Sequence, residues 1–159
     1  LVGFTSLSQR LEIRELAATV DRFENVAYAV AAGHGGRVVK VIGDEVMFVA
    51  DGAGAGGRIA LELPSQCAEE GLPNVRIGLA CGPALAWEGD YLGPTVNLAS
   101  RLAAVADPGS VLVSEAVGRE LAGDPMFVLR AGRTRRLKGL GRTPSFVLSS
   151  ATVHAVKGA

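Results

Sequence analysis

The chain has 159 residues, of which 48% are hydrophobic and 20% are charged, and its 16 basic residues balance 16 acidic ones. This length is typical of one domain, and the hydrophobic content is that of a globular protein rather than a disordered one. The net charge of zero provides no overall field that would attract a nucleic acid or a membrane surface. We therefore expect one globular domain over residues 1–151, a loose tail at 152–159 and no nucleic-acid partner.

The cysteines and histidines do not have the spacing of a metal site. Cys67 and Cys81 lie in apolar surroundings, and His34 and His154 are far apart in the sequence. Such cysteine usage is typical of a reducing compartment. No apolar run approaches the roughly 20 residues that cross a bilayer, and no signal peptide is evident. We expect a cytoplasmic domain without direct membrane insertion, compatible with a membrane tether or regulatory domain outside this chain.

The first third of the chain is predicted to form a loop and then a long helix. Residues 1–8 resemble the end of a strand that runs into a loop, with Ser6 or Ser8 available to cap the next element. Apolar residues then recur at the spacing of an amphipathic helix, and glycines at 33, 35 and 36 end it. These apolar residues are Leu16, Val20, Phe23, Ala27 and Val30.

Residues 37–49 predict a hairpin that carries charged side chains. Two runs of β-branched and bulky apolar residues flank the turn signal Gly43-Asp44. Side chains alternate along a strand, so we expect Lys40 on the same face as Val38 and Ile42. Its ammonium must then be solvated, paired or used at a cleft. The hairpin taken alone favours an ordinary edge-strand lysine and an ordinary turn aspartate.

The segment after the hairpin contains a glycine pattern that resembles a dinucleotide-binding loop. Gly52, Gly54 and Gly57 match G-x-G-x-x-G, but that site needs an acidic residue at the end of the next strand. The next predicted strand, 75–81, ends instead in glycine and proline. We therefore interpret residues 52–57 as a flexible Gly/Ala turn before a helix at 58–70, which Pro64 would kink or break.

The second half of the chain alternates strands and helices irregularly. Strands at 75–81 and 84–87 are predicted on either side of Gly82-Pro83, and 88–94 is predicted as a loop. Pro94 begins a helix that extends to Ala106 and carries Asn97 and Arg101 on one face. The remaining predicted elements are a strand at 111–113, a helix at 115–121 capped by Ser114, and strands at 127–129, 133–137 and 146–148. This order predicts an α+β fold with a ferredoxin-like β-α-β-β-α-β core and additional C-terminal strands and helices.

Four stretches together resemble the catalytic domain of class III nucleotide cyclases, in that family's order and over nearly the whole chain. They are Leu1-Val-Gly-Phe-Thr-Ser-Leu-Ser, Val39-Lys-Val-Ile-Gly-Asp-Glu-Val-Met, Gly89-Asp-Tyr-Leu-Gly-Pro-Thr-Val-Asn-Leu-Ala-Ser-Arg101 and Leu137-Lys-Gly-Leu-Gly141. The resemblance implies an adenylyl cyclase of the bacterial homodimeric type, which makes cyclic AMP and pyrophosphate from ATP.

The resemblance also implies a site for two divalent cations, Mg or Mn. Asp44 matches one of the family's two metal-binding aspartates, and the backbone carbonyl of Leu1 matches another ligand. The second aspartate, like the family's first strand, is expected just before Leu1. Amides around Phe4 and Thr5 match those that meet phosphate oxygens. Hard oxygen ligands of this kind suit Mg or Mn better than Zn.

Lys40 and Asp90 match the pair that selects the base in this family, and the chemistry of adenine supports ATP as the substrate. A lysine can donate to N1 of adenine, and an aspartate can accept from its 6-amino group. Guanine presents the inverse pattern, which would leave both groups unsatisfied at about 1 to 3 kcal/mol per buried group. We therefore expect a preference for ATP over GTP.

The remaining matches concern the ribose and the phosphates. Asn97 and Arg101 match residues that position the ribose and stabilise the transition state, and Lys138 matches one that meets the terminal phosphates. Their spacing alone favours an exposed polar helix face and a solvated turn. The family builds each site between two domains, and this chain carries both sets of residues, which implies a head-to-tail homodimer. The alternatives are an inactive nucleotide-binding regulatory module and a guanylyl or relaxed-specificity cyclase.

Overall fold

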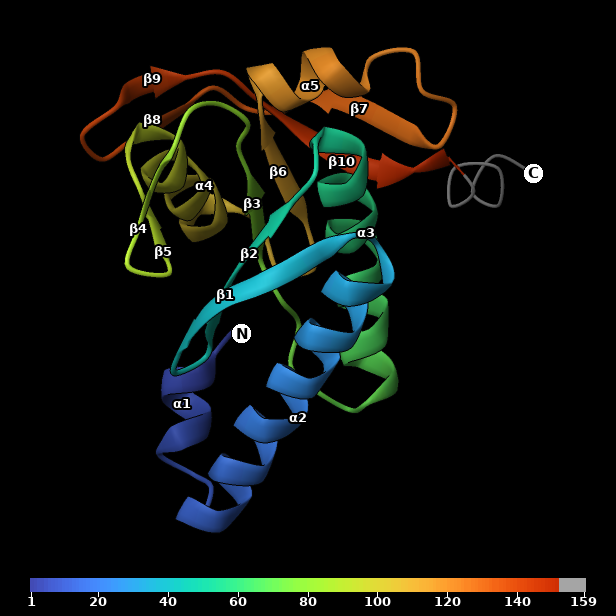
Figure 1. Cartoon of the computed structure of the whole chain (residues 1–159). Coiled ribbons are helices and arrows are strands. Elements are labelled where there is room, and N and C mark those ends of the chain that lie inside the picture. Colours follow the sequence, from blue (N-terminus) through green and yellow to red (C-terminus); the bar gives the residue numbers. More distant parts are fainter. Residues whose placement is uncertain (152–159) are drawn as a thin grey trace.

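The computed structural model describes residues 1–151, so the predicted tail at 152–159 lies outside the described residues (Figure 1). The helices are α1 (Phe4–Ser8), α2 (Ile13–Gly33), α3 (Ala53–Glu69), α4 (Pro94–Val105) and α5 (Glu115–Leu121). The strands are β1 (Gly36–Ile42), β2 (Glu45–Ala50), β3 (Ile77–Leu79), β4 (Leu85–Trp87), β5 (Asp90–Leu92), β6 (Val111–Ser114), β7 (Phe127–Ala131), β8 (Arg135–Leu137), β9 (Gly141–Thr143) and β10 (Ser145–Ser150). None of the described helices combines the length and the hydrophobicity that a membrane span requires.

Four strands form a mixed sheet, and six form hairpins around it. The sheet has the order β3-β6-β10-β7, with β3 parallel to β6 and β10 antiparallel to both of its neighbours. The pairs β1–β2, β4–β5 and β8–β9 are separate antiparallel ribbons. The described residues contain the α-β-β-α-β portion of the predicted core, from α2 to β3. The α+β class is thus confirmed.

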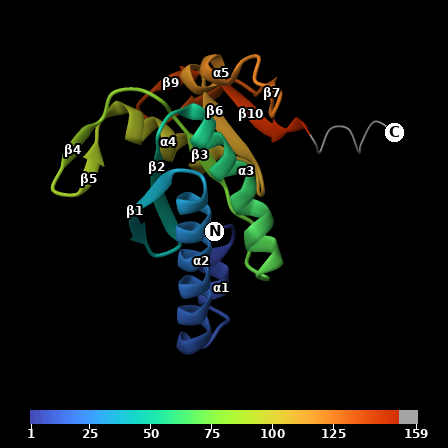
Figure 2. The same ribbon diagram turned by 45° about the vertical axis from the view of Figure 1, so that its right-hand side comes forward.

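The two faces of β6 contact different hydrophobic clusters. Val111 and Val113 pack with buried residues of α2, α3 and α5, whereas Leu112 packs with Leu102 of α4 and Leu137 of β8. Adjacent side chains of a strand point to opposite faces, so this division places α4 on the face of the sheet away from α2 and α3. Figure 2 shows α2 beside α3, with α4 apart from both. The sheet is therefore covered on both sides.

The loop predicted at the start of the chain is wrong, because residues 4–8 form the short helix α1. The amide of Leu7 donates to the carbonyl of Gly3 at 3.0 Å, which closes the first helical turn. The hydroxyl of Ser8 donates to the carbonyl of Thr5 within the same helix rather than capping the next one. The N-cap of α2 is instead Glu12, which forms a capping box with Glu15. The predicted long helix itself is confirmed.

The flexible turn predicted at 52–57 is also wrong, because α3 begins at Ala53 and continues past Pro64 to Glu69. Four small residues of this segment, Ala53, Ala55, Gly56 and Gly57, are buried. A Cβ added at Gly57 would lie 2.9 Å from the ring of Phe127, so glycine at that position permits close packing of α3 on β7. The glycine pattern therefore belongs to a helix that packs closely against its neighbours. The close approach that glycine permits outweighs the low helix propensity of the residue.

The strand predictions after α3 require three corrections. The segment predicted as a strand at 75–81 is reduced to β3, which pairs with β6 and not with the next strand. The predicted loop at 88–94 contains β5, whose partner is β4. The strand predicted at 133–137 is reduced to β8, which forms a hairpin with β9. Only the partner of β3 is distant in the sequence, whereas β5 and β9 each pair with the strand that directly precedes them.

Candidate functional site

The β1–β2 hairpin is confirmed, and it contains a bulge that the sequence did not predict. Val38 is paired with Phe48 and Lys40 with Met47, so Val39 is an extra residue on β1. A bulge of this kind shifts the alternation of side chains by one position.

The bulge corrects the predicted orientation of Lys40. Val38 packs against the main hydrophobic cluster, whereas Ile42 is 61% exposed. Lys40 and Ile42 are two residues apart in the regularly paired part of β1, so their side chains point to the same face. The extra residue Val39 lies between Lys40 and Val38, so those two side chains point to opposite faces. Lys40 therefore shares the outer face with Ile42, as expected, but not with Val38. This orientation keeps the ammonium of Lys40 out of the apolar core.

On this outer face Lys40 meets Asp90 of β5. The ammonium Nζ donates to Oδ2 of Asp90 at 2.5 Å, and both side chains are 35% exposed. The other carboxylate oxygen, Oδ1, accepts from the amide of Tyr91 at 2.7 Å. The hydrogen bond from Lys40, followed by that from the Tyr91 amide, lowers the pKa of Asp90 below its ordinary value. Two residues that are fifty positions apart in the sequence thus form one charged pair.

Asp44 lies in the turn of the same hairpin, next to the first residue of the chain. The nitrogen of Leu1 is 2.9 Å from the carbonyl oxygen of Asp44 and 3.2 Å from its Oδ2. The carboxylate and the nearby backbone oxygens are hard donors of the type that Mg and Mn prefer. Residues 1–151 contain no cluster of three histidine, cysteine or acidic side chains able to hold a metal ion. These oxygen atoms therefore suit part of the ligand set of such a cation. Within the described residues, Asp44 contributes the one carboxylate of this set.

Asn97 and Arg101 extend from the exposed side of α4. Pro94 occupies the first turn of this helix, as predicted, and the two polar residues are one helical turn apart. Leu102 is buried on the opposite side of the helix, where it packs against Leu112 of the sheet. The buried leucine fixes the rotation of α4, so that Asn97 and Arg101 remain accessible.

One cavity of about 1150 Å³ brings several of the predicted site residues together. It lies between the β1–β2 hairpin, β3 and α4. Among the residues that line it are Leu1, Lys40, Asp44, Asn97 and Arg101. A volume of this size is sufficient for a nucleotide, because ligand pockets commonly measure about 300 to 1,000 Å³.

Other predicted residues do not line this cavity. Phe4 and Thr5 belong to α1, and Thr5 is exposed. Lys138 is exposed at the turn between β8 and β9. Asp90 does not line the cavity, but it bonds to Lys40, which does. A single chain thus assembles part of the predicted set.

Sequence reasoning missed a second contact between β1 and β5. Arg37 Nη2 donates to the hydroxyl of Tyr91 at 3.0 Å, next to the pair of Lys40 and Asp90. The only sequence signal is the position of Arg37 three residues before Lys40. In a regular strand that spacing would place the two cations on opposite faces, so the contact could not be predicted without the bulge.

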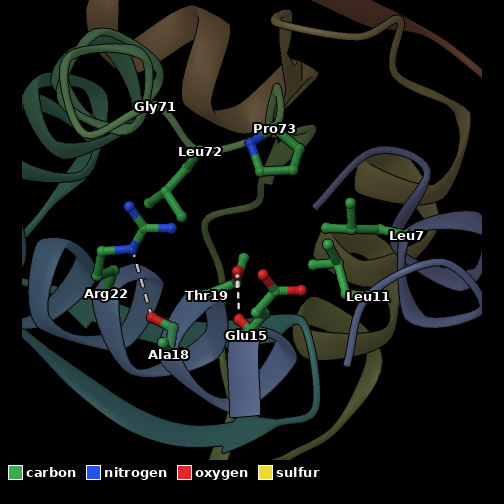
Figure 3. A pocket seen from close by; sticks show the side chains of 9 residues that line it. All are labelled: Leu7, Leu11, Glu15, Ala18, Thr19, Arg22, Gly71, Leu72 and Pro73. Atoms are coloured by element: carbon green, nitrogen blue, oxygen red, sulfur yellow. Dashed lines mark hydrogen bonds between the residues drawn. The ribbon is translucent and has the colours of Figure 1, made fainter. Parts of the chain in front are cut away.

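A second hollow, of about 590 Å³, lies between α1, α2 and the residues that follow α3 (Figure 3). Leu7, Leu11 and Leu72 provide its apolar lining. Its polar groups already have partners within the chain. Thr19 donates to the carbonyl of Glu15, and Arg22 donates through Nε to the carbonyl of Ala18 and through Nη1 to that of Glu70. None of the predicted site residues lines this hollow, so it is separate from the candidate site.

Known proteins resemble this chain over most of its length. Residues 1–150 match the model of the adenylate and guanylate cyclase catalytic domain. An adenylate cyclase from Glutamicibacter nicotianae is 42% identical over 94% of this chain and 38% of its own length. An adenylate cyclase from Streptomyces coelicolor is 46% identical over 76% of this chain and 32% of its own length. The chain therefore spans about a third of the length of these curated relatives.

Solved structures show the same fold. The catalytic core of a rhodopsin-guanylyl cyclase with converted specificity, solved in complex with ATPαS, superposes with a TM-score of 0.84. It is 27% identical, and the match covers 94% of this chain and 90% of that one. The family model and these relatives agree with the motifs that pointed to a cyclase. The chain thus belongs to the family of adenylate and guanylate cyclase catalytic domains.

Proposed function

We propose that this domain is an adenylyl cyclase that converts ATP into 3′,5′-cyclic AMP and pyrophosphate. The observation that carries the proposal is the contact of Lys40 with Asp90, two groups that together match the hydrogen-bonding edge of adenine. The curated relatives named adenylate cyclase support the same activity.

The pair of Lys40 and Asp90 would select adenine. An ammonium has three donors and each carboxylate oxygen can accept more than one hydrogen bond, so their mutual contact leaves capacity for a base. Lys40 would donate to N1 of adenine, and Asp90 would accept from the 6-amino group. Guanine would place a donor against the ammonium and an acceptor against the carboxylate. Unpaired buried groups of this kind discriminate strongly between substrates.

The reaction is an intramolecular displacement at the α-phosphorus. The ribose 3′-oxygen forms a bond to that phosphorus, the bond to the bridging oxygen of the β-phosphate breaks, and the 3′-hydroxyl proton is released. Arg101 would neutralise charge that develops on the phosphates, and Asn97 would orient the ribose. Amides around Phe4 and Thr5, together with Lys138, would bind the phosphate chain. No side chain is assigned as a general base.

Two divalent cations, Mg or Mn, would be held partly by Asp44 and the carbonyl of Leu1. When bound, they would supply Lewis-acid activation of the 3′-hydroxyl and neutralise the leaving pyrophosphate.

We further propose that two copies of the chain pair head to tail to complete each site. Within one copy, Lys138 lies on the β8–β9 turn and does not line the cavity that Asp44 lines. In a symmetric dimer, one copy would contribute Asp44 and the phosphate-binding amides. The other would contribute the pair of Lys40 and Asp90 together with Asn97, Arg101 and Lys138.

The test is to measure cyclic AMP and cyclic GMP made from ATP and GTP by the native polypeptide, with Mg or with Mn, across protein concentration. The proposal predicts cyclic AMP as the main product and a specific activity that rises with concentration in dilute solution. Comparable amounts of both products would indicate a relaxed-specificity cyclase. Binding of ATP without product under any condition would indicate a regulatory module and would overturn the proposed reaction.

A further inference from the structure

Arg37 of β1 and Tyr91 of β5 form a second link beside the pair of Lys40 and Asp90. Arg37 Nη2 donates to the Tyr91 hydroxyl at 3.0 Å, and its guanidinium carbon is 5.5 Å from the centre of the tyrosine ring. Both a hydrogen bond and a cation–π contact therefore join the two side chains. Two neighbouring residues of β5 are thus each held by a cation of β1.

The bulge at Val39 makes this double link feasible. In a regular strand, residues 37 and 40 would lie on opposite faces, because their separation is odd. Because of the register shift between Val38 and Lys40, the side chains of Arg37 and Lys40 lie on the same outer face. Both cations can then reach β5, which crosses this face of the hairpin.

The β4–β5 hairpin depends on such links for its position. It is a two-stranded ribbon outside the main sheet, and such ribbons have little stability of their own in water. Its apolar residues Leu85, Trp87 and Leu92 are 59%, 59% and 47% exposed, so burial contributes little to its placement. At its base the hydroxyl of Thr95 donates to the carbonyl of Pro83 at 2.7 Å. Near Asp90, the contacts with Lys40 and Arg37 fix the ribbon against β1.

We infer that Arg37 and Tyr91 are positioning residues that hold Asp90 in register with Lys40 and thereby set the preference for ATP over GTP. This inference rests on the proposed function. The amide of Tyr91 also donates to Asp90, so any displacement of Tyr91 moves a hydrogen-bond partner of that carboxylate. Substrate discrimination depends strongly on such placement, because small misplacements of a recognition group weaken its directional hydrogen bonds.

The test is to compare Tyr91→Phe and Arg37→Ala with the wild type. Tyr91→Phe removes the hydroxyl but keeps the ring, and Tyr28→Phe is the matched control because Tyr28 is exposed on α2. The ratio of kcat/KM for ATP to that for GTP is measured for each protein, along with the dissociation constants of both nucleotides. We expect Tyr91→Phe and Arg37→Ala to lower the ATP/GTP ratio by about three- to tenfold, mainly through KM for ATP. Tyr28→Phe should leave the ratio unchanged.

Two further variants separate positioning from a general loss of structure. Arg37→Lys keeps a cation that can donate to the Tyr91 hydroxyl, so it should restore most of the ratio. In an Asp90→Asn background, Tyr91→Phe should cause no further change, because its effect acts through Asp90. A melting temperature equal to that of the wild type would confirm that Tyr91→Phe remains folded.

The outcomes also distinguish this inference from the proposed function. A wild type that makes cyclic AMP, together with variants that keep its ATP/GTP ratio, would overturn the positioning role and leave the cyclase proposal intact. A wild type that binds ATP in preference to GTP without turnover would overturn the cyclase proposal, and the ratio of dissociation constants would then decide the positioning role. A wild type that binds neither nucleotide would overturn both.

Discussion

Gly78 of β3 lies directly against the backbone of Ala99 in α4. A Cβ added at Gly78 would overlap the carbonyl oxygen of Ala99 and the amide nitrogen of Ala103, and neither backbone atom can move without moving the helix. The close approach of α4 to the sheet, and with it the position of Asn97 and Arg101, therefore requires glycine at residue 78.

Gly78→Ala is expected to destabilise the domain by about 3 kcal/mol, because overpacking of this kind costs about 1 to 3 kcal/mol or more. The free energy of unfolding from a urea titration measures the effect. Gly54→Ala is the control, since its added methyl group would meet Arg58 at an ordinary 3.6 Å and should stabilise α3 by about 0.5 kcal/mol. Equal stability of Gly78→Ala and the wild type would show that α4 can move away from β3 without loss.

Two cysteines are expected to differ in their reactivity. Burial raises the pKa of Cys67 to about 11, and the residue is 1% exposed. The thiol of Cys81 donates to Oε1 of Glu120 at 2.8 Å, and this hydrogen bond, followed by burial and the carboxylate charge, raises its pKa as well. Iodoacetamide should therefore modify Cys81 slowly and Cys67 only on unfolding, because the thiolate is the reactive form.

Glu120→Gln should accelerate the alkylation of Cys81 by about three- to tenfold near neutral pH. It replaces the carboxylate whose hydrogen bond favours the thiol with an amide that can donate to the thiolate, and it also removes the charge that disfavours the thiolate. Peptide mapping after timed alkylation measures the rate at each cysteine. Glu115→Gln makes the same change of charge on the same helix and should have no effect on this rate. An unchanged rate for Glu120→Gln would show that the contact with Glu120 does not control the thiol.

The parts of the fold that could be predicted from the sequence are those determined by local pattern. The periodicity of α2 and the two apolar runs around Gly43-Asp44 specify a helix and a hairpin without reference to the rest of the chain. The glycines at 52–57 were misinterpreted because their role depends on Phe127, which is distant in the sequence. A glycine that permits close packing and one that permits a turn have the same signature in a single sequence.

Part of the candidate site, like part of the fold, could be predicted from the sequence. The family motifs identified Lys40 and Asp90, which the fold brings into contact. The link from Arg37 to Tyr91 was not predictable, because it depends on the bulge at Val39 and on the pairing of β5 with β4. Both features depend on strand register, which the turn geometry and the burial of one strand face determine together.

The contact of Lys40 with Asp90 should stabilise the fold in a pH-dependent manner. The pKa of Asp90 is lower in the folded state, so its contribution is complete above the ordinary carboxyl pKa and is lost as the pH falls through the lower folded value. The difference in melting temperature between the wild type and Asp90→Asn should therefore be constant from about pH 6 to about pH 8 and shrink below about pH 4. Thermal unfolding at several pH values measures this difference. A difference that persists in strong acid would mean that the carboxylate charge is not its source.

Exchange of Lys40 and Asp90, the proposed base-selecting pair, should change the nucleotide preference. Lys40→Glu would place an acceptor where guanine has its N1 donor, and Asp90→Cys would remove the carboxylate that repels O6. The double variant should lower kcat/KM for ATP by about a hundredfold or more and raise the share of cyclic GMP among the products. The yields of both cyclic nucleotides from an equimolar mixture of ATP and GTP provide the measurement. An intact preference for ATP in a folded double variant would show that other residues select the base.

The proposed sharing of sites between two copies can be tested by mixing two inactive variants. Asp44→Asn and Arg101→Ala should each lose nearly all turnover, because in the proposed dimer each variant disables one half of every site. In an equimolar mixture that exchanges subunits, half of the dimers carry one intact site, so the mixture should recover about a quarter of the wild-type rate. A mixture of Asn97→Ala with Arg101→Ala is the control and should stay inactive, since both changes affect the same half of the site. Asp44 and Arg101 line one cavity within a single chain, so no recovery despite demonstrated exchange would instead place both residues in a site formed by one copy.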